Sequence, residues 1–98
     1  MKWLDEEEAE YVEYLELERR GYAWVLEHHG AWSREEALAE AREFYRYEPP
    51  GNRYRTLVFH DTSWHWAMLR IHGSLYWQAH PELATESAEY EAFIRSST

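Results

Sequence analysis

The sequence predicts an all-α fold, a small bundle of four to five helices that forms one domain over residues 1–98. Apolar residues recur at spacings of three, four and seven, which is the pattern of helices with one buried face. Glycines and prolines are few, and they separate segments of helical length. Hydrophobic residues make up 45% of the 98 residues, which is enough for one modest core.

The first predicted helix begins near Leu4 and ends at Gly30. Its apolar stripe runs through Leu4, Tyr11, Leu15, Tyr22 and Leu26, and Val12 and Tyr14 widen it. Gly21 lies within this segment at a cost of about 1 kcal/mol relative to alanine, so the alternative is two helices that meet there. Because the stripe continues past Gly21, we favour one helix with a weak point at that residue.

Two further helices have clear start signals. Ser33 precedes Glu36 by three residues in "SREE", the pattern of a capping box, and the helix that follows ends before Pro49. Its narrow apolar face comprises Ala37, Leu38, Ala41, Phe44 and Tyr45. A final short helix covers about 86–96, with Ser87 as a candidate cap. The residues expected to face inward from it are Tyr90, Phe93 and Ile94.

Residues 52–61 are ambiguous, because they are rich in the β-branched and aromatic residues typical of strands. One interpretation is a β-hairpin at about 54–71, which would make the fold α+β. A two-stranded hairpin is only marginally stable unless it packs on helices. We therefore favour an extended connector that places Leu57 and Phe59 on the core.

Residues 62–80 are predicted to form one helix that starts at the capping residues Asp61, Thr62 and Ser63 and stops at Pro81. One face of this helix is mainly aliphatic and comprises Trp64, Met68, Ile71, Leu75 and Ala79. Since the segment is apolar on nearly all sides, we expect a central, buried helix.

Three histidines of this helix, His65, His72 and His80, share a second face, at spacings of seven and eight residues. On a continuous helix those spacings separate the side chains by about 10 to 12 Å along the axis, too far apart to bind one metal ion. Asp61 and His65 are four residues apart and are the candidate start of a metal site, which would need His28, His29 or Glu27 from another helix. We expect hydrogen-bonded structural histidines instead, and no cofactor.

A third face of the same helix comprises Trp66, Arg70, Gly73 and Trp77. The glycine allows close approach, and the guanidinium of Arg70 lies within stacking reach of both indoles. This face is the candidate partner-binding surface. It would equally receive the protein's own first helix, with Arg70 paired to a glutamate, and we favour that internal role. If the face is left uncovered, self-association would bury it.

The charge of the chain excludes several classes of ligand. With 19 acidic and 10 basic residues, the net charge is −9, which opposes direct binding of nucleic acid or of an anionic membrane surface. The chain has no cysteine, so thiolate metal ligands and cysteine nucleophiles are excluded. The first residues are acidic, and no run approaches about 18 apolar residues, so we expect a cytoplasmic protein.

No catalytic motif was found, which favours a role other than catalysis. Our first hypothesis is a small acidic accessory protein that binds another protein or itself through its aromatic-rich surface. The alternative is a nucleic-acid mimic that inhibits a DNA- or RNA-binding protein, because eight acidic residues lie between residues 5 and 18. A second alternative is binding of a small ligand or metal ion at the segment rich in histidine and tryptophan.

Overall fold

The computed structural model describes residues 2–98, with side chains from Glu6 onward, and this part of the chain contains helices and no strand. The α-helices are α1 (Lys2–Gly30), α2 (Arg34–Phe44), α3 (Ser63–His72), α4 (Tyr76–Ala79) and α5 (Ala88–Ser97), with 3₁₀ turns η1 (Leu57–His60) and η2 (Pro81–Leu83). The predicted all-α fold is confirmed, and the alternative hairpin at about 54–71 is wrong.

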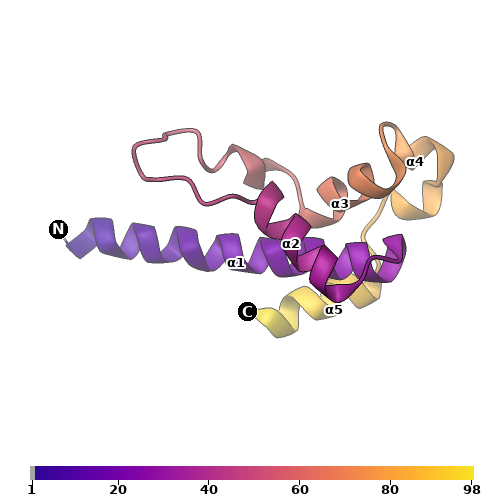
Figure 1. Cartoon of the computed structure of the whole chain (residues 1–98), viewed down its shortest axis with the longest axis horizontal. Helices are drawn as coiled ribbons and strands as arrows, with labels where there is room; N and C mark the ends of the chain where they lie inside the picture. The colour runs from indigo at the N-terminus through magenta and orange to yellow at the C-terminus, as the bar shows by residue number, and fades with distance from the viewer. Residues whose placement is uncertain (1) are drawn as a thin grey trace.

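The long helix α1 is the axis of the molecule, which measures 48 × 26 × 23 Å (Figure 1). It continues through Gly21 to Gly30, as predicted. Helices α2, α3 and α5 pack against α1, and they lie around its C-terminal half. The N-terminal half projects beyond them, accompanied by the loop between α2 and η1. Two parts of α1 therefore have different surroundings.

The core lies where α1 crosses the shorter helices. Tyr11, Leu15, Tyr22 and Leu26 of the predicted stripe are all buried. The ring of Tyr22 stacks on Phe44 with 5.0 Å between centroids and meets Tyr45 edge-on at 5.7 Å. Because phenol rings fill so much of this core, their hydroxyl groups need buried partners.

Those partners form a polar network inside the core. The Tyr45 hydroxyl donates a hydrogen bond of 3.3 Å to the carboxylate of Glu18, which is only 8% exposed. The hydroxyls of Ser63 and Tyr90 lie 2.5 Å apart. Burial raises the pKa of Glu18, and burial raises the pKa of Tyr90 to about 12. No buried side-chain nitrogen or oxygen within the described residues lacks a hydrogen-bond partner.

The predicted helix starts are confirmed at the level of hydrogen bonds. Ser33 Oγ accepts a bond from the backbone N–H of Glu36 at 3.1 Å and donates to its carboxylate at 2.8 Å. Ser87 Oγ accepts from the N–H of Tyr90. Of the three candidate caps before α3, Thr62 is the one that accepts a bond from the helix. Each cap satisfies an otherwise unpaired N–H group in the first turn.

The prediction of one helix over residues 62–80 is wrong. The chain leaves helical geometry at Gly73, with φ of 85°, and again at Leu75, with φ of 61°. Glycine tolerates the first conformation, and the N–H of Gly73 still bonds the carbonyl of Leu69. The break reverses the chain, so that Leu83 returns to accept a hydrogen bond from the Trp64 indole at 2.9 Å. Leu75 and Ala79, expected on the aliphatic face, are exposed.

The connector before α3 places one of its two expected anchors on the core. The half-buried ring of Phe59 contacts Tyr11, Tyr14 and Tyr45. Leu57, the other expected anchor, is exposed, because the 3₁₀ turn points consecutive side chains in different directions.

No helix within residues 2–98 is long and apolar enough to cross a membrane.

Candidate functional site

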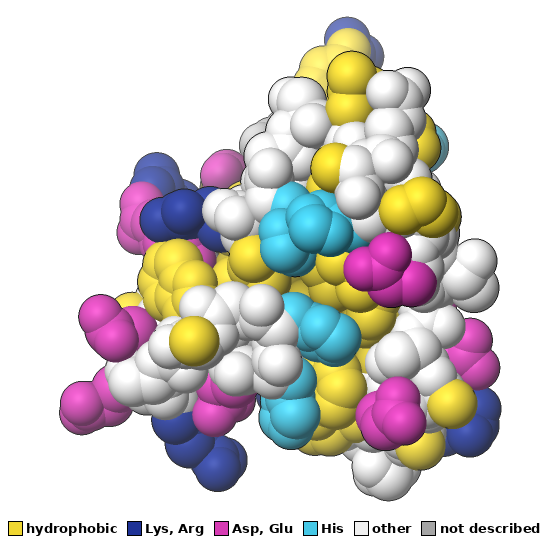
Figure 2. All heavy atoms as spheres, turned by 90° about the vertical axis from the view of Figure 1, so that its right-hand side faces the viewer, with side chains coloured by type: hydrophobic (Ala, Val, Ile, Leu, Met, Phe, Trp, Pro, Cys, Tyr) yellow, Lys and Arg dark blue, Asp and Glu magenta, His cyan; other side chains and the backbone are white. Residues whose placement is uncertain are grey.

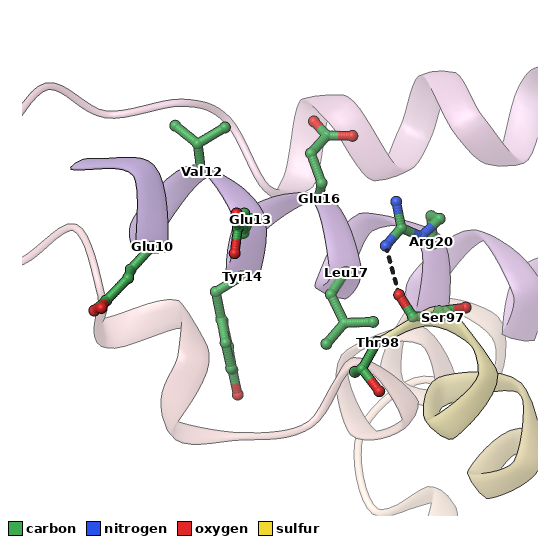
Figure 3. Close-up of a pocket in the computed structure, with 9 residues that line it drawn as sticks. All are labelled: Glu10, Val12, Glu13, Tyr14, Glu16, Leu17, Arg20, Ser97 and Thr98. Atoms are coloured by element: carbon green, nitrogen blue, oxygen red, sulfur yellow. Dashed lines mark hydrogen bonds between the residues drawn. The ribbon is translucent and has the colours of Figure 1, made fainter. Parts of the chain in front are cut away.

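A groove of about 630 Å³ runs along the projecting half of α1 and ends at the last residues of α5 (Figure 3). In Figure 3, Tyr14 and Leu17 point to the same side of α1, and Thr98 lies beside Leu17. The residues that line the groove are Glu10, Val12, Glu13, Tyr14, Glu16, Leu17, Arg20, Ser97 and Thr98.

The groove presents apolar side chains to solvent. Tyr14 is 45% exposed, and Leu17 is half-buried beside it; Val12 is 40% exposed and points to the opposite side of α1 in Figure 3. The ring of Tyr14 is held in place, because it meets Phe59 edge-on with 4.6 Å between centroids. Sequence reasoning placed Val12 and Tyr14 on a widened core-facing stripe. The stripe is wider than the core that covers it, because α2, α3 and α5 pack on the other half of α1.

Carboxylates surround these apolar side chains. Glu10 and Glu13 are exposed and form no hydrogen bond or ion pair with any side chain of residues 6–98. Glu16 accepts a hydrogen bond of 2.7 Å from Arg19. Among the described residues that line the groove, the one cation is Arg20, which donates a hydrogen bond of 3.2 Å to the backbone carbonyl of Ser97. The groove therefore has an apolar centre and a negatively charged rim.

The neighbouring side of α1 is already covered by the loop after α2. Glu8 accepts hydrogen bonds from Arg55 at 2.8 Å and from the hydroxyl of Tyr47 at 2.5 Å. The bond from Tyr47, followed by that from Arg55, lowers the pKa of Glu8. The guanidinium of Arg55 also lies 3.8 Å from the ring centre of Tyr11. Arg55 and Tyr47 of the loop thus pair with Glu8, whereas the carboxylates that line the groove face solvent.

The predicted partner-binding face of Trp66, Arg70, Gly73 and Trp77 is not one surface, because the chain breaks at Gly73. The indole of Trp66 donates a hydrogen bond of 2.9 Å to the carbonyl of Val58. Trp66 is half-buried, whereas Trp77 lies on α4 and is exposed. The ring of His65 neighbours the indole of Trp66 and also the indole of Trp77, and so links the two.

Arg70 has partners on α2 and on the turn before it. Its guanidinium pairs with Glu40 at 3.1 Å and lies 4.9 Å from the ring centre of Trp32. The internal role predicted for Arg70 pairs it with a glutamate, and in the structure that glutamate comes from α2. Arg70 and Trp66 are thus both engaged within the molecule.

Asp61 and His65, the candidate metal pair, lie close together, and no third ligand joins them from the described residues. His65 Nε2 lies 3.9 Å from the Asp61 carboxylate, and His65 Nδ1 lies 3.0 Å from the hydroxyl of Tyr76. They lie at the edge of a cavity of about 360 Å³. His28 stacks on Trp24 instead, and His29 meets Trp64 edge-on. Among the residues with described positions, no three or more His, Asp or Glu side chains converge to hold a metal ion.

Comparison of the chain with protein-family models, curated proteins and solved structures found no match. A functional proposal therefore depends on the geometry of the groove itself.

Proposed function

We propose that the protein is an interaction module that binds a basic amphipathic helix of another protein in the groove along α1. The observation that supports this proposal is the exposed ring of Tyr14 beside Leu17 in a groove also lined by the carboxylates of Glu10 and Glu13, which have no partner among the side chains of residues 6–98. Exposed apolar side chains with a polar rim are typical of sites at which proteins bind partners.

An amphipathic helix matches both properties of the groove. Such helices insert apolar side chains at positions i, i+3, i+4 and i+7 into apolar grooves. Full burial of one leucine is worth about 1.5–3 kcal/mol, whereas an exposed ion pair contributes about 0.2–1 kcal/mol. We therefore expect apolar anchors to provide most of the affinity. Lysine or arginine on the flanks of the helix would select this partner over acidic ones.

A second copy of this chain is a poorer occupant of the groove. Each copy carries a net charge of −9, and the groove faces solvent with Glu10 and Glu13. Docking two such surfaces would bring carboxylates together, which is unfavourable. We therefore expect the pure protein to be a monomer. Sedimentation of the pure protein would reveal self-association through this groove.

Nucleic-acid mimicry, the alternative hypothesis, receives less support from the arrangement of charges. Of the acidic residues on α1, Glu8, Glu16 and Glu18 have partners within the chain. Glu10 and Glu13, which have no partner among the side chains of residues 6–98, line the same groove as the apolar side chains of Tyr14 and Leu17, which a mimic of a phosphate backbone does not need. A partner that recognises charge alone would be insensitive to replacement of Tyr14 by another uncharged residue.

The test uses a fluorescent amphipathic peptide of leucine and lysine as the probe and measures its Kd by anisotropy. The control peptide replaces each lysine with glutamate. We expect saturable binding of the basic peptide and none of the acidic one. The groove variant Y14E should weaken binding about tenfold, which corresponds to 1.4 kcal/mol. The matched control L57E alters an exposed apolar residue on η1 and should leave Kd within about twofold.

Charge reversal provides an independent arm. E13K lies in the groove, and E35K alters an exposed glutamate of α2 by the same charge. We expect E13K to weaken binding several-fold more than E35K at low salt, with the difference shrinking as salt screens the charges. Equal effects of Y14E and L57E, together with equal effects of E13K and E35K, would refute the groove as the binding site.

A further inference from the structure

The end of the molecule opposite the groove collects histidines from elements that are distant in sequence. Figure 2 shows histidine side chains gathered on this end, with apolar surface between them. His28 and His29 come from the last turn of α1, and His72 ends α3. Positive charge on His28 and on His72 contributes, after burial, to the lowered pKa of His29, which indicates that these rings are close.

The closest pair is His72 and His80. Their ring centroids lie 4.5 Å apart with an angle of 42° between the ring planes. A continuous helix would separate these residues by about 12 Å, given its rise of 1.5 Å per residue. The reversal of the chain at Gly73 and Leu75 brings the rings together. The expectation that these two histidines are too far apart to share an ion is therefore wrong.

We propose that His72 and His80 form a two-imidazole site for a divalent transition-metal ion such as Cu²⁺ or Ni²⁺, with water in the remaining positions. Neutral imidazole is a preferred ligand of these ions and a poor ligand of Mg²⁺ and Ca²⁺. Neither ring forms a hydrogen bond with any other described residue, so their nitrogens are free to coordinate a metal. The net charge of −9 favours a cation in general.

The geometry of the pair favours one class of ion. If one nitrogen of each ring bound a shared ion with metal–nitrogen bonds of about 2.0–2.1 Å, each ring centre would lie about 3.2 Å from the metal, and centres 4.5 Å apart would subtend about 90°. That angle belongs to square-planar and octahedral ions rather than to tetrahedral Zn²⁺. His80 Nδ1 lies 3.8 Å from the Glu82 carboxylate, which places an acceptor beside the nitrogen that would not bind the metal.

The experiment measures Tm of the protein with and without NiCl₂ or CuCl₂, beside ZnCl₂ and MgCl₂. An ion that binds the native state raises Tm by about 5–10 °C at tenfold excess over its Kd in a domain of this size. We expect this rise with Ni²⁺ and Cu²⁺, a smaller one with Zn²⁺ and none with Mg²⁺. H72Q and H80Q should each abolish the rise, whereas H60Q, which alters an exposed histidine outside the pair, should retain it.

A second measurement identifies the ligands directly. Substoichiometric Cu²⁺ broadens the NMR signals of ligating rings first, so the imidazole resonances of His72 and His80 should disappear before those of His28 and His29. An unchanged Tm at millimolar Ni²⁺ and Cu²⁺, or an equal rise in H72Q, H80Q and wild type, would overturn the proposal. So would earlier broadening at His28 and His29. The peptide-binding groove uses none of these residues, so failure of one proposal leaves the other intact.

Discussion

Gly21 of α1 lies directly against Ser63 of α3, so that a Cβ atom on Gly21 would overlap the Ser63 hydroxyl. The same Cβ would lie 2.9 Å from Cδ1 of Ile94 on α5. The glycine thus marks the point where three helices cross. The Ser63 hydroxyl is fixed at this point by its hydrogen bond to Tyr90.

G21A is expected to destabilise the protein, although alanine is the better helix former by about 1 kcal/mol. The added methyl group must displace Ser63 or Ile94, and overpacking of this kind costs about 1–3 kcal/mol. Denaturant unfolding of G21A and wild type measures the difference. A stabilised G21A would show that α1 and α3 are farther apart than the structure places them. G51A serves as the control, because nothing lies within 4 Å of a Cβ at Gly51.

E18Q is expected to change the dependence of stability on pH. Because burial raises the pKa of Glu18 in the folded state, the unfolded chain loses this proton first as pH rises. Stability therefore falls from the unfolded pKa of about 4.5 up to the folded pKa, and the deficit persists above it. The glutamine keeps an acceptor for Tyr45 and has no proton to lose.

The measurement for E18Q is the difference in free energy of unfolding between E18Q and wild type from pH 4 to pH 8. The difference should move in favour of E18Q as pH rises. Subtracting the two curves removes the opposite contribution of Glu8, whose pKa is lowered in the folded state. A difference that is independent of pH would contradict the assigned burial of Glu18.

G73A is expected to cost about 1–3 kcal/mol, because Gly73 has φ of 85° and ψ of −171°, a region nearly restricted to glycine. The cost is one of backbone conformation alone, since nothing lies within 4 Å of the added methyl group. Thermal unfolding measures it. If G73A is as stable as wild type and gains helicity by circular dichroism, then the continuous helix predicted for residues 62–80 competes closely with the observed break.

Sequence reasoning succeeded where local rules and tertiary packing agree. The stripe through Tyr11, Leu15, Tyr22 and Leu26 predicted α1, and "SREE" predicted the start of α2. The same reasoning failed at Gly73, because a glycine is tolerated within a helical pattern and the return of Leu83 to Trp64 is a tertiary contact that periodicity does not reveal. The prediction that His72 and His80 lie far apart was wrong for the same reason, because it assumed one continuous helix.

The groove was only partly accessible to prediction. Val12 and Tyr14 carried a signal, since they widen the apolar stripe of α1 beyond what one neighbouring helix covers. Periodicity does not reveal which half of a long helix its neighbours cover. The contribution of α5, which brings Ser97 to Arg20 across 77 positions of sequence, likewise follows from tertiary structure alone.

The most direct test of the groove as a binding site is ¹H–¹⁵N NMR of the labelled protein during titration with the leucine–lysine peptide. We expect saturable chemical-shift changes that are largest at the amides of Val12, Glu13, Tyr14 and Leu17 and at Ser97 and Thr98. The amides of α4 at the opposite end should stay unchanged. Changes centred on Trp77 and His65, or shifts that do not saturate, would contradict the proposal.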